Sequence, residues 1–84
     1  MLWAVSIGRT RYGEIFYIAK SRNAAFVEGR KWLGNRFDPS DDIMSFRDGT
    51  YEGLRMKHGD FVYAPYEGRA GKVSRREAQV LAIK

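Results

Sequence analysis

The chain has 84 residues, a formal net charge of +5 and no cysteine, and 44% of its residues are hydrophobic. This length and composition predict one globular domain over residues 1–84, and the lack of cysteine excludes disulfides, thiolate catalysis and cysteine-based zinc sites. No apolar run approaches the roughly 20 residues that span a bilayer, and the opening residues do not form a basic leader with a long apolar core, so we expect a cytoplasmic protein that is neither secreted nor membrane-embedded.

Two strands joined by a basic loop are predicted at the start of the chain. Large and small side chains alternate over residues 2–7, and a second strand is predicted over about residues 14–19. Gly8 and Gly13 stand at the two ends of the segment between them, as expected of a hairpin loop that needs positive φ angles. The tip of this hairpin carries Arg9, Arg11 and Tyr12.

A helix is predicted over residues 22–33, because apolar residues recur there at helical spacing. Ser21 or Asn23 can cap its first turn, and Gly34 can end it. Gly29 lies on the apolar side of this helix, where glycine costs about 1 kcal/mol relative to alanine. We therefore expect Gly29 to allow a close approach to the sheet.

The middle of the chain is predicted to form a turn and a second hairpin. Residues 37–42 are rich in aspartate and contain proline, which favours a turn, and residues 43–47 alternate as a strand. Asp48-Gly49 is the pair most typical of a type I′ hairpin turn, so Thr50-Tyr51 is expected to begin the return strand. Gly53 then marks a bulge or the end of that strand.

The last third of the chain is predicted to contain a turn, a strand and a helix. The turn covers residues 58–60, the strand follows over residues 61–64, and the pattern Ser74-Arg75-Arg76-Glu77 fits a capping box that begins a helix over about residues 75–83. The predicted fold is α+β, with a small, mostly antiparallel sheet of four or five strands packed by two helices. The element order is β-β-α-β-β-β-α.

Charge is segregated along the sequence. Residues 1–36 carry seven Lys or Arg and two Glu. Residues 37–60 carry three Lys or Arg and six acidic residues, and residues 61–84 carry five Lys or Arg and two acidic residues. Basic side chains can contact phosphates, and an exposed tyrosine can stack on a base. The candidate nucleic-acid-binding residues are therefore Arg9, Arg11, Tyr12, Arg69, Lys72, Arg75 and Arg76, provided that they share one surface. The alternative is that the hairpin loop is ordinary solvated surface.

No catalytic, cofactor or metal site is predicted. Residues 68–74 resemble a phosphate-binding loop, but Tyr66 stands at the first glycine position of that pattern and Val73 replaces the magnesium-binding hydroxyl. Asp38, Asp41 and Asp42, with His58, could supply ligands for a cation, but their spacing fits a solvated turn better. His58 also lacks a nucleophile and a carboxylate in a catalytic arrangement.

Two segments show resemblances to known groups of proteins. A pattern typical of the KOW element of ribosome- and polymerase-binding proteins is resembled by Gly59-Asp60-x-Val62 followed by Gly68-x-x-Gly71-x-Val73. This resemblance implies a strand at Lys72-Val73. The capping box at Ser74 predicts a helix there instead, and we favour the helix. Residues 16–64 are similar in pattern to short accessory proteins encoded by phages of actinobacteria, through a Gly-Leu-Arg element at residues 53–55 among others. The second resemblance implies a viral accessory origin and transfers no functional residues.

The sequence thus predicts a noncatalytic binding module without a cofactor, a small-molecule substrate or a membrane partner. One hypothesis is contact with nucleic acid through the basic hairpin tip and the basic C-terminal segment. The alternative is a protein partner, for example a host enzyme or defence complex that the chain inhibits or modulates. The candidate protein-interface residues are Asp41, Asp42, Tyr51 and Tyr66.

Overall fold

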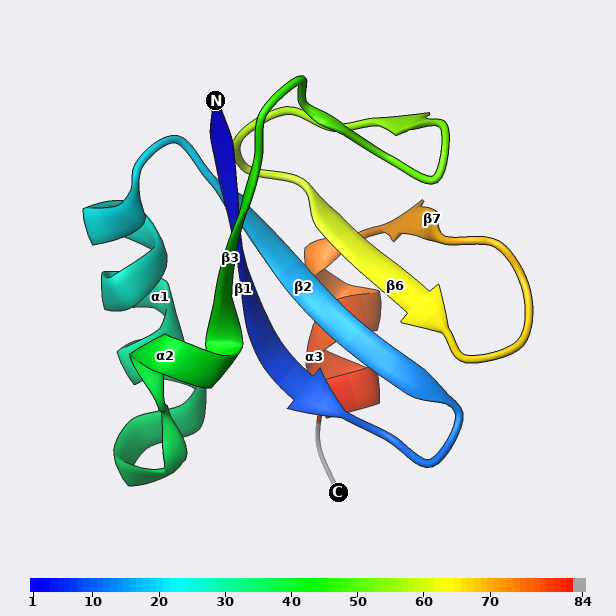
Figure 1. Cartoon of the computed structure of the whole chain (residues 1–84). Helices are drawn as coiled ribbons and strands as arrows, with labels where there is room; N and C mark the ends of the chain where they lie inside the picture. The colour runs from blue at the N-terminus through cyan, green and yellow to red at the C-terminus, as the bar shows by residue number, and fades with distance from the viewer. Residues whose placement is uncertain (83–84) are drawn as a thin grey trace.

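An antiparallel sheet of five strands forms the centre of the fold, as the computed structural model shows for residues 1–82 (Figure 1). Its strands lie in the order β3-β1-β2-β6-β7, with the bounds Leu2–Arg9 (β1), Gly13–Ala19 (β2), Ile43–Phe46 (β3), Phe61–Pro65 (β6) and Gly71–Val73 (β7). A separate pair of short strands comprises β4 (Thr50–Tyr51) and β5 (Leu54–Arg55). The helical elements are α1 (Arg22–Leu33), η1 (Gly34–Arg36), α2 (Pro39–Asp42) and α3 (Arg75–Ala82). The predicted α+β class with a mainly antiparallel sheet is confirmed.

Both faces of the sheet are covered, because successive side chains of a strand point to opposite faces. Val5 and Ile15 pack on one face in a cluster with Ala25 of α1 and Ala78 of α3. Ala4 and Phe16 pack on the other face with Met56 and with side chains of β4 and β5. The sheet therefore lies between a helical layer and the β4–β5 segment.

Helix α1 begins and ends where the sequence predicts. The Ser21 hydroxyl accepts a hydrogen bond from the Ala24 N–H at 3.0 Å, and Gly34 adopts a φ of 59° at the other end. The expected role of Gly29 was wrong in one respect. A Cβ atom at Gly29 would lie 2.3 Å from the Phe37 ring, so the close approach is to Phe37 rather than to the sheet.

The middle of the chain differs most from the prediction. The predicted turn at residues 37–42 is partly helical, because Asp38 caps the single turn of α2 and accepts a hydrogen bond from the Ser40 N–H at 3.1 Å. β3 pairs with β1 rather than with the segment after Asp48-Gly49. A type I′ turn needs positive φ at both central residues. Glu52 (φ 50°) and Gly53 (φ 83°) meet that requirement between β4 and β5. Asp48 does not meet it, because its φ is not positive.

The C-terminal segment holds both a strand and a helix. Lys72 and Val73 belong to β7, which pairs with β6 and which the prediction missed by favouring the helix alone. The capping box is confirmed, because the Ser74 N–H donates to Glu77 Oε1 at 3.0 Å and the Glu77 N–H donates to Ser74 Oγ at 3.1 Å. The expected helix end at Ile83 lies outside the described residues. Among residues 1–82, no helix has the length and apolar character that crossing a membrane requires.

Candidate functional site

The tip of the β1–β2 hairpin is an ordered turn with an exposed aromatic ring. The Thr10 hydroxyl oxygen accepts hydrogen bonds from the N–H groups of Tyr12 and Gly13, both at 3.0 Å. The Tyr12 side chain is 68% exposed, and the Arg11 guanidinium lies 6.0 Å from the centre of its ring. The backbone of the tip is therefore fixed while the ring of Tyr12 faces solvent.

A second exposed tyrosine lies beside this tip. Gly13 faces Pro65 at the end of the β2–β6 ladder, and the next residue, Tyr66, donates its N–H to the carbonyl oxygen of Tyr12 at 2.9 Å. Tyr66 is 61% exposed. The loop that it begins, between β6 and β7, also carries Arg69 and Glu67, both exposed. We call these two adjacent loops, with Arg11 and Tyr12 on one and Tyr66 and Arg69 on the other, the tyrosine end of the sheet.

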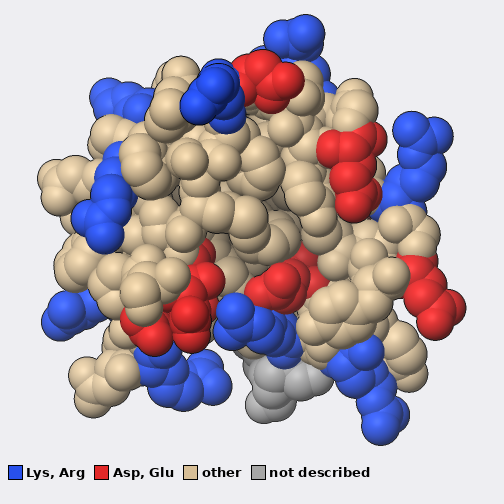
Figure 2. Space-filling model, in the orientation of Figure 1, with Lys and Arg blue, Asp and Glu red and all other residues tan. Residues whose placement is uncertain are grey.

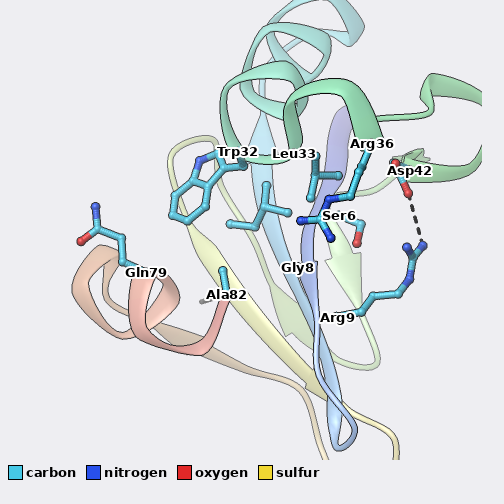
Figure 3. Close-up of a pocket in the computed structure, with 10 residues that line it drawn as sticks. Ser6, Gly8, Arg9, Trp32, Leu33, Arg36, Asp42, Gln79 and Ala82 are labelled. Atoms are coloured by element: carbon cyan, nitrogen blue, oxygen red, sulfur yellow. Dashed lines mark hydrogen bonds and ion pairs between the residues drawn. The ribbon is translucent and has the colours of Figure 1, made fainter. Parts of the chain in front are cut away.

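Arg9 is held by carboxylates instead of facing solvent alone. Its Nε lies 2.7 Å from Glu14 Oε2, and one of its terminal nitrogens lies 3.2 Å from Asp42 Oδ1 (Figure 3). Burial by itself would lower the pKa of Arg9, but the charges of Glu14 and Asp42 outweigh it and raise the pKa. Asp42 is only 4% exposed and also accepts the Asp38 N–H at 2.9 Å. This network ties β1, β2 and α2 together.

A groove of about 700 Å³ lies next to the Arg9–Asp42 pair, between β1, α1 and α3 (Figure 3). Trp32 and Leu33 of α1 line it together with Ala82 of α3, and Arg36 extends over β1 toward Ser6. Its lining combines apolar side chains with guanidinium groups and one carboxylate. Ser6, which lines the groove, donates a hydrogen bond from its hydroxyl to Glu14 Oε2 at 3.1 Å. The same carboxylate oxygen lies 2.7 Å from Arg9 Nε, so Glu14 is shared between Ser6 and Arg9.

The remaining basic candidates lie at the other end of β6. Lys72 forms an ion pair with Asp60 at 3.1 Å, and the Arg75 guanidinium lies 5.1 Å from the centre of the Phe61 ring. Phe61 begins β6, whereas Pro65 ends it at the tyrosine end, roughly 13 Å away at the rise of a β-strand. Lys72 and Arg75, with the neighbouring exposed Arg76, are therefore separated from the tyrosine end.

The candidate protein-interface residues occupy several parts of the molecule. Asp41 is exposed, but Asp42 is buried against Arg9. Tyr51 packs edge-on against Phe46 with their ring centres 5.6 Å apart. Burial raises the pKa of Tyr51, and the charges of Glu52 and Glu14 add to this effect. Tyr66 belongs to the tyrosine end, so these residues do not form one patch.

Neither charge nor metal ligands mark a single strong site. On the face that Figure 2 shows, Lys and Arg lie around the rim and Asp and Glu stand between several of them. Within residues 1–82, no group of three or more His, Asp or Glu side chains is arranged to hold a metal ion. His58 lies in the turn before β6, as predicted.

Comparisons with known proteins returned no match to a protein-family model, to a curated protein or to a solved structure. Function is therefore argued from the geometry. The sequence alone did not place Tyr66 beside Tyr12, because only the β2–β6 register brings their two loops together. The hairpin was predicted, but Gly8 and Gly13 lie in β1 and β2 without the expected positive φ. No local pattern predicted that the β6–β7 loop lies beside the hairpin tip.

Proposed function

We propose that this chain is a noncatalytic binding module that contacts single-stranded nucleic acid through the tyrosine end. The observation that carries the proposal is the hydrogen bond from the Tyr66 N–H to the Tyr12 carbonyl oxygen, because it joins the two loops that present exposed rings. The surface needs no movement of the backbone to present both tyrosines.

The chemistry of the tyrosine end suits unpaired bases. An aromatic ring that stacks on a base contributes about 1–3 kcal/mol, and every base has a face on which to stack. Arg11 and Arg69 supply charge for the phosphates on either side. A duplex hides its base faces within the stack, so two exposed rings favour a single strand.

The small number of cations sets the salt dependence. For single strands, the slope of log K against log salt concentration is about −0.7 for each phosphate neutralised. Two arginines at the tyrosine end predict a slope of about −1.4. If all six basic candidates of the sequence took part, the slope would be about −4. A salt titration therefore distinguishes a local site from a surface that uses both ends of the sheet.

Fluorescence anisotropy with a short labelled oligonucleotide, as single strand and as duplex, tests the site. We expect Tyr12→Ala and Tyr66→Ala each to weaken single-strand binding by about 5- to 150-fold, from the energy of one stacked base. Glu67→Gln should strengthen binding, because it removes the acidic side chain from the same loop. Arg76→Gln, at the other end of β6, is the matched control and should leave the affinity unchanged.

Several results would contradict the proposal. They are equal affinities of the wild type and both alanine variants, a stronger affinity for duplex than for single strand, or a slope near −4. Capture from a host lysate with and without nuclease tests the protein-partner hypothesis. A defined protein that stays bound after nuclease treatment, without detectable oligonucleotide affinity, would favour an inhibitor or modulator of that protein.

A further inference from the structure

The groove between β1, α1 and α3 has walls that contacts within the protein hold in place. Its volume of about 700 Å³ lies within the range of small-molecule sites, roughly 300–1,000 Å³. The Trp32 indole N–H donates to Glu28 Oε1 at 3.3 Å, and the indole packs against Phe61 with ring centres 5.9 Å apart. On the other side, a Cβ atom at Gly8 would lie 3.0 Å from the Cβ atom of Ala82, so α3 lies directly against β1. The hollow therefore exists without any movement of its walls.

The charged groups of the groove differ in whether they have partners. Asp42 is only 4% exposed and is paired with Arg9, and the Glu14 carboxylate is shared between Arg9 and Ser6. Arg36 is exposed and forms no ion pair within residues 1–82. The carboxylates at this groove thus already have donors, whereas the guanidinium of Arg36 can still donate to an additional acceptor.

The backbone holds Arg36 at the rim of the groove. Gly34 ends α1 with a φ of 59°, and the Phe37 N–H donates to the Gly34 carbonyl oxygen at 3.2 Å. Phe37 is buried, so Arg36 lies between two anchored neighbours. Its side chain extends over β1 toward Ser6 (Figure 3). A guanidinium in this position presents two parallel N–H groups, which match the two oxygens of one carboxylate.

We propose that this groove binds a small aromatic carboxylate, with its carboxylate on Arg36 and its ring against Trp32 and Leu33. Both of these wall residues are half-buried, so a ring placed there covers apolar surface that now faces solvent. A single carboxylate suits the site better than a phosphate dianion, because the carboxylates of Asp42 and Glu14 repel additional negative charge. The groove includes no residue of the tyrosine end, so this inference is independent of nucleic-acid binding.

Titration with 2-naphthoate, followed by NMR of the full chain, locates the ligand. The chain has two tryptophans, so two indole N–H signals report on two places. Trp32 lines the groove, whereas Trp3 lies four residues before Ile7 along β1, roughly 13 Å away. We expect the Trp32 signal to shift and the Trp3 signal to stay, with a dissociation constant of about 0.1–1 mM for a ligand of this size. No shift of the Trp32 signal well above this concentration, or equal shifts of both signals, would overturn the proposal.

A charge variant and two altered ligands test the two halves of the site. Arg36→Gln should weaken 2-naphthoate binding by about 5- to 12-fold, between the effects of an exposed ion pair and of a charge-assisted hydrogen bond. The neutral 2-naphthamide should bind the wild type more weakly than 2-naphthoate does and should bind Arg36→Gln equally well. Decahydro-2-naphthoate, which lacks the aromatic rings, should bind about 2- to 12-fold more weakly than 2-naphthoate.

Arg30→Gln is the matched control, because Arg30 is an exposed arginine of α1 that does not line the groove. It should leave 2-naphthoate affinity unchanged, and circular dichroism confirms that both variants are folded. Arg36→Gln should also keep the oligonucleotide affinity of the wild type. Equal 2-naphthoate affinities of the wild type and Arg36→Gln, or equal affinities of the wild type for 2-naphthoate and either altered ligand, would also overturn the proposal.

Discussion

Replacing Gly29 with alanine tests the contact between α1 and the Phe37 ring. Three atoms of that ring would lie 2.3–2.6 Å from the new Cβ atom, closer than side chains pack in proteins. Phe37 is 9% exposed and packs edge-on against Phe26, with ring centres 5.2 Å apart. The ring therefore cannot move aside without disturbing a second aromatic side chain.

Two effects of opposite sign decide the outcome. Alanine is favoured over glycine inside a helix by about 1 kcal/mol. Overpacking a filled core costs about 1–3 kcal/mol, and moving the Phe37 ring away from Phe26 costs about 0.5–1.5 kcal/mol more. We therefore expect Gly29→Ala to lower the free energy of unfolding by about 1–3 kcal/mol, although helix propensity alone predicts stabilisation.

Urea denaturation followed by tryptophan fluorescence measures this change, at constant m-value. The double variant Gly29→Ala with Phe37→Leu supplies the control, because a smaller side chain leaves room for the methyl group. We expect Gly29→Ala to be less costly in the Phe37→Leu background than in the wild type. A gain of about 1 kcal/mol from Gly29→Ala in the wild-type background would refute the packing of Phe37 on α1.

Further substitutions test single interactions. Arg9→Gln should lower the free energy of unfolding, measured in urea, by about 1–2 kcal/mol. This is less than for a fully buried ion pair, because the Arg9 side chain is 55% exposed. The same variant should leave oligonucleotide affinity unchanged. The pKa of Tyr51 is raised in the folded state, so its neutral form contributes stability below pH about 10. This stability is lost as the pH rises through the pKa of Tyr51 in the folded protein. Alkaline denaturation should therefore be steeper for the wild type than for Tyr51→Phe, and identical curves would contradict this. Glu52→Asn should raise the free energy of unfolding by about 0.5–1 kcal/mol, measured by thermal denaturation, because asparagine tolerates positive φ better. Ser74→Ala should lower it by about 0.5–2 kcal/mol through loss of the cap, and an unchanged melting temperature would argue against the capping box.

The elements that could be predicted are those whose cause lies within a few residues. The hairpin of β1 and β2 was predicted from alternation, and α1 was predicted from the Ser21 cap and from apolar spacing. Gly8 and Gly13 do not have the positive φ that the sequence predicts for them, so that part of the prediction was wrong. The elements that could not be predicted depend on pairing between distant segments. β7 has only three residues and no strong local pattern, and it is a strand because β6 lies beside it.

The same distinction applies to the candidate site. Glu14 lies opposite Arg9 across the predicted hairpin, so that ion pair was within reach of the sequence. The second carboxylate on Arg9 comes from Asp42, which follows 33 residues later and reaches Arg9 only because β3 pairs with β1. Net charge by segment therefore overestimated the number of cations that are free to bind a ligand.

The choice between two glycine turns shows how burial outweighs local preference. Asp48-Gly49 is the better type I′ sequence, yet the turn forms at Glu52-Gly53, where a non-glycine residue at positive φ costs about 1–2 kcal/mol. Placing the turn there lets Tyr51 and Leu54 pack on the face of the sheet that the helices leave open. Full burial of one such side chain contributes about 1.5–3 kcal/mol, so the partial burial of both Tyr51 and Leu54 offsets the strain at Glu52. The Asp48 carboxylate instead accepts hydrogen bonds from Thr50 and turns the chain away from β3.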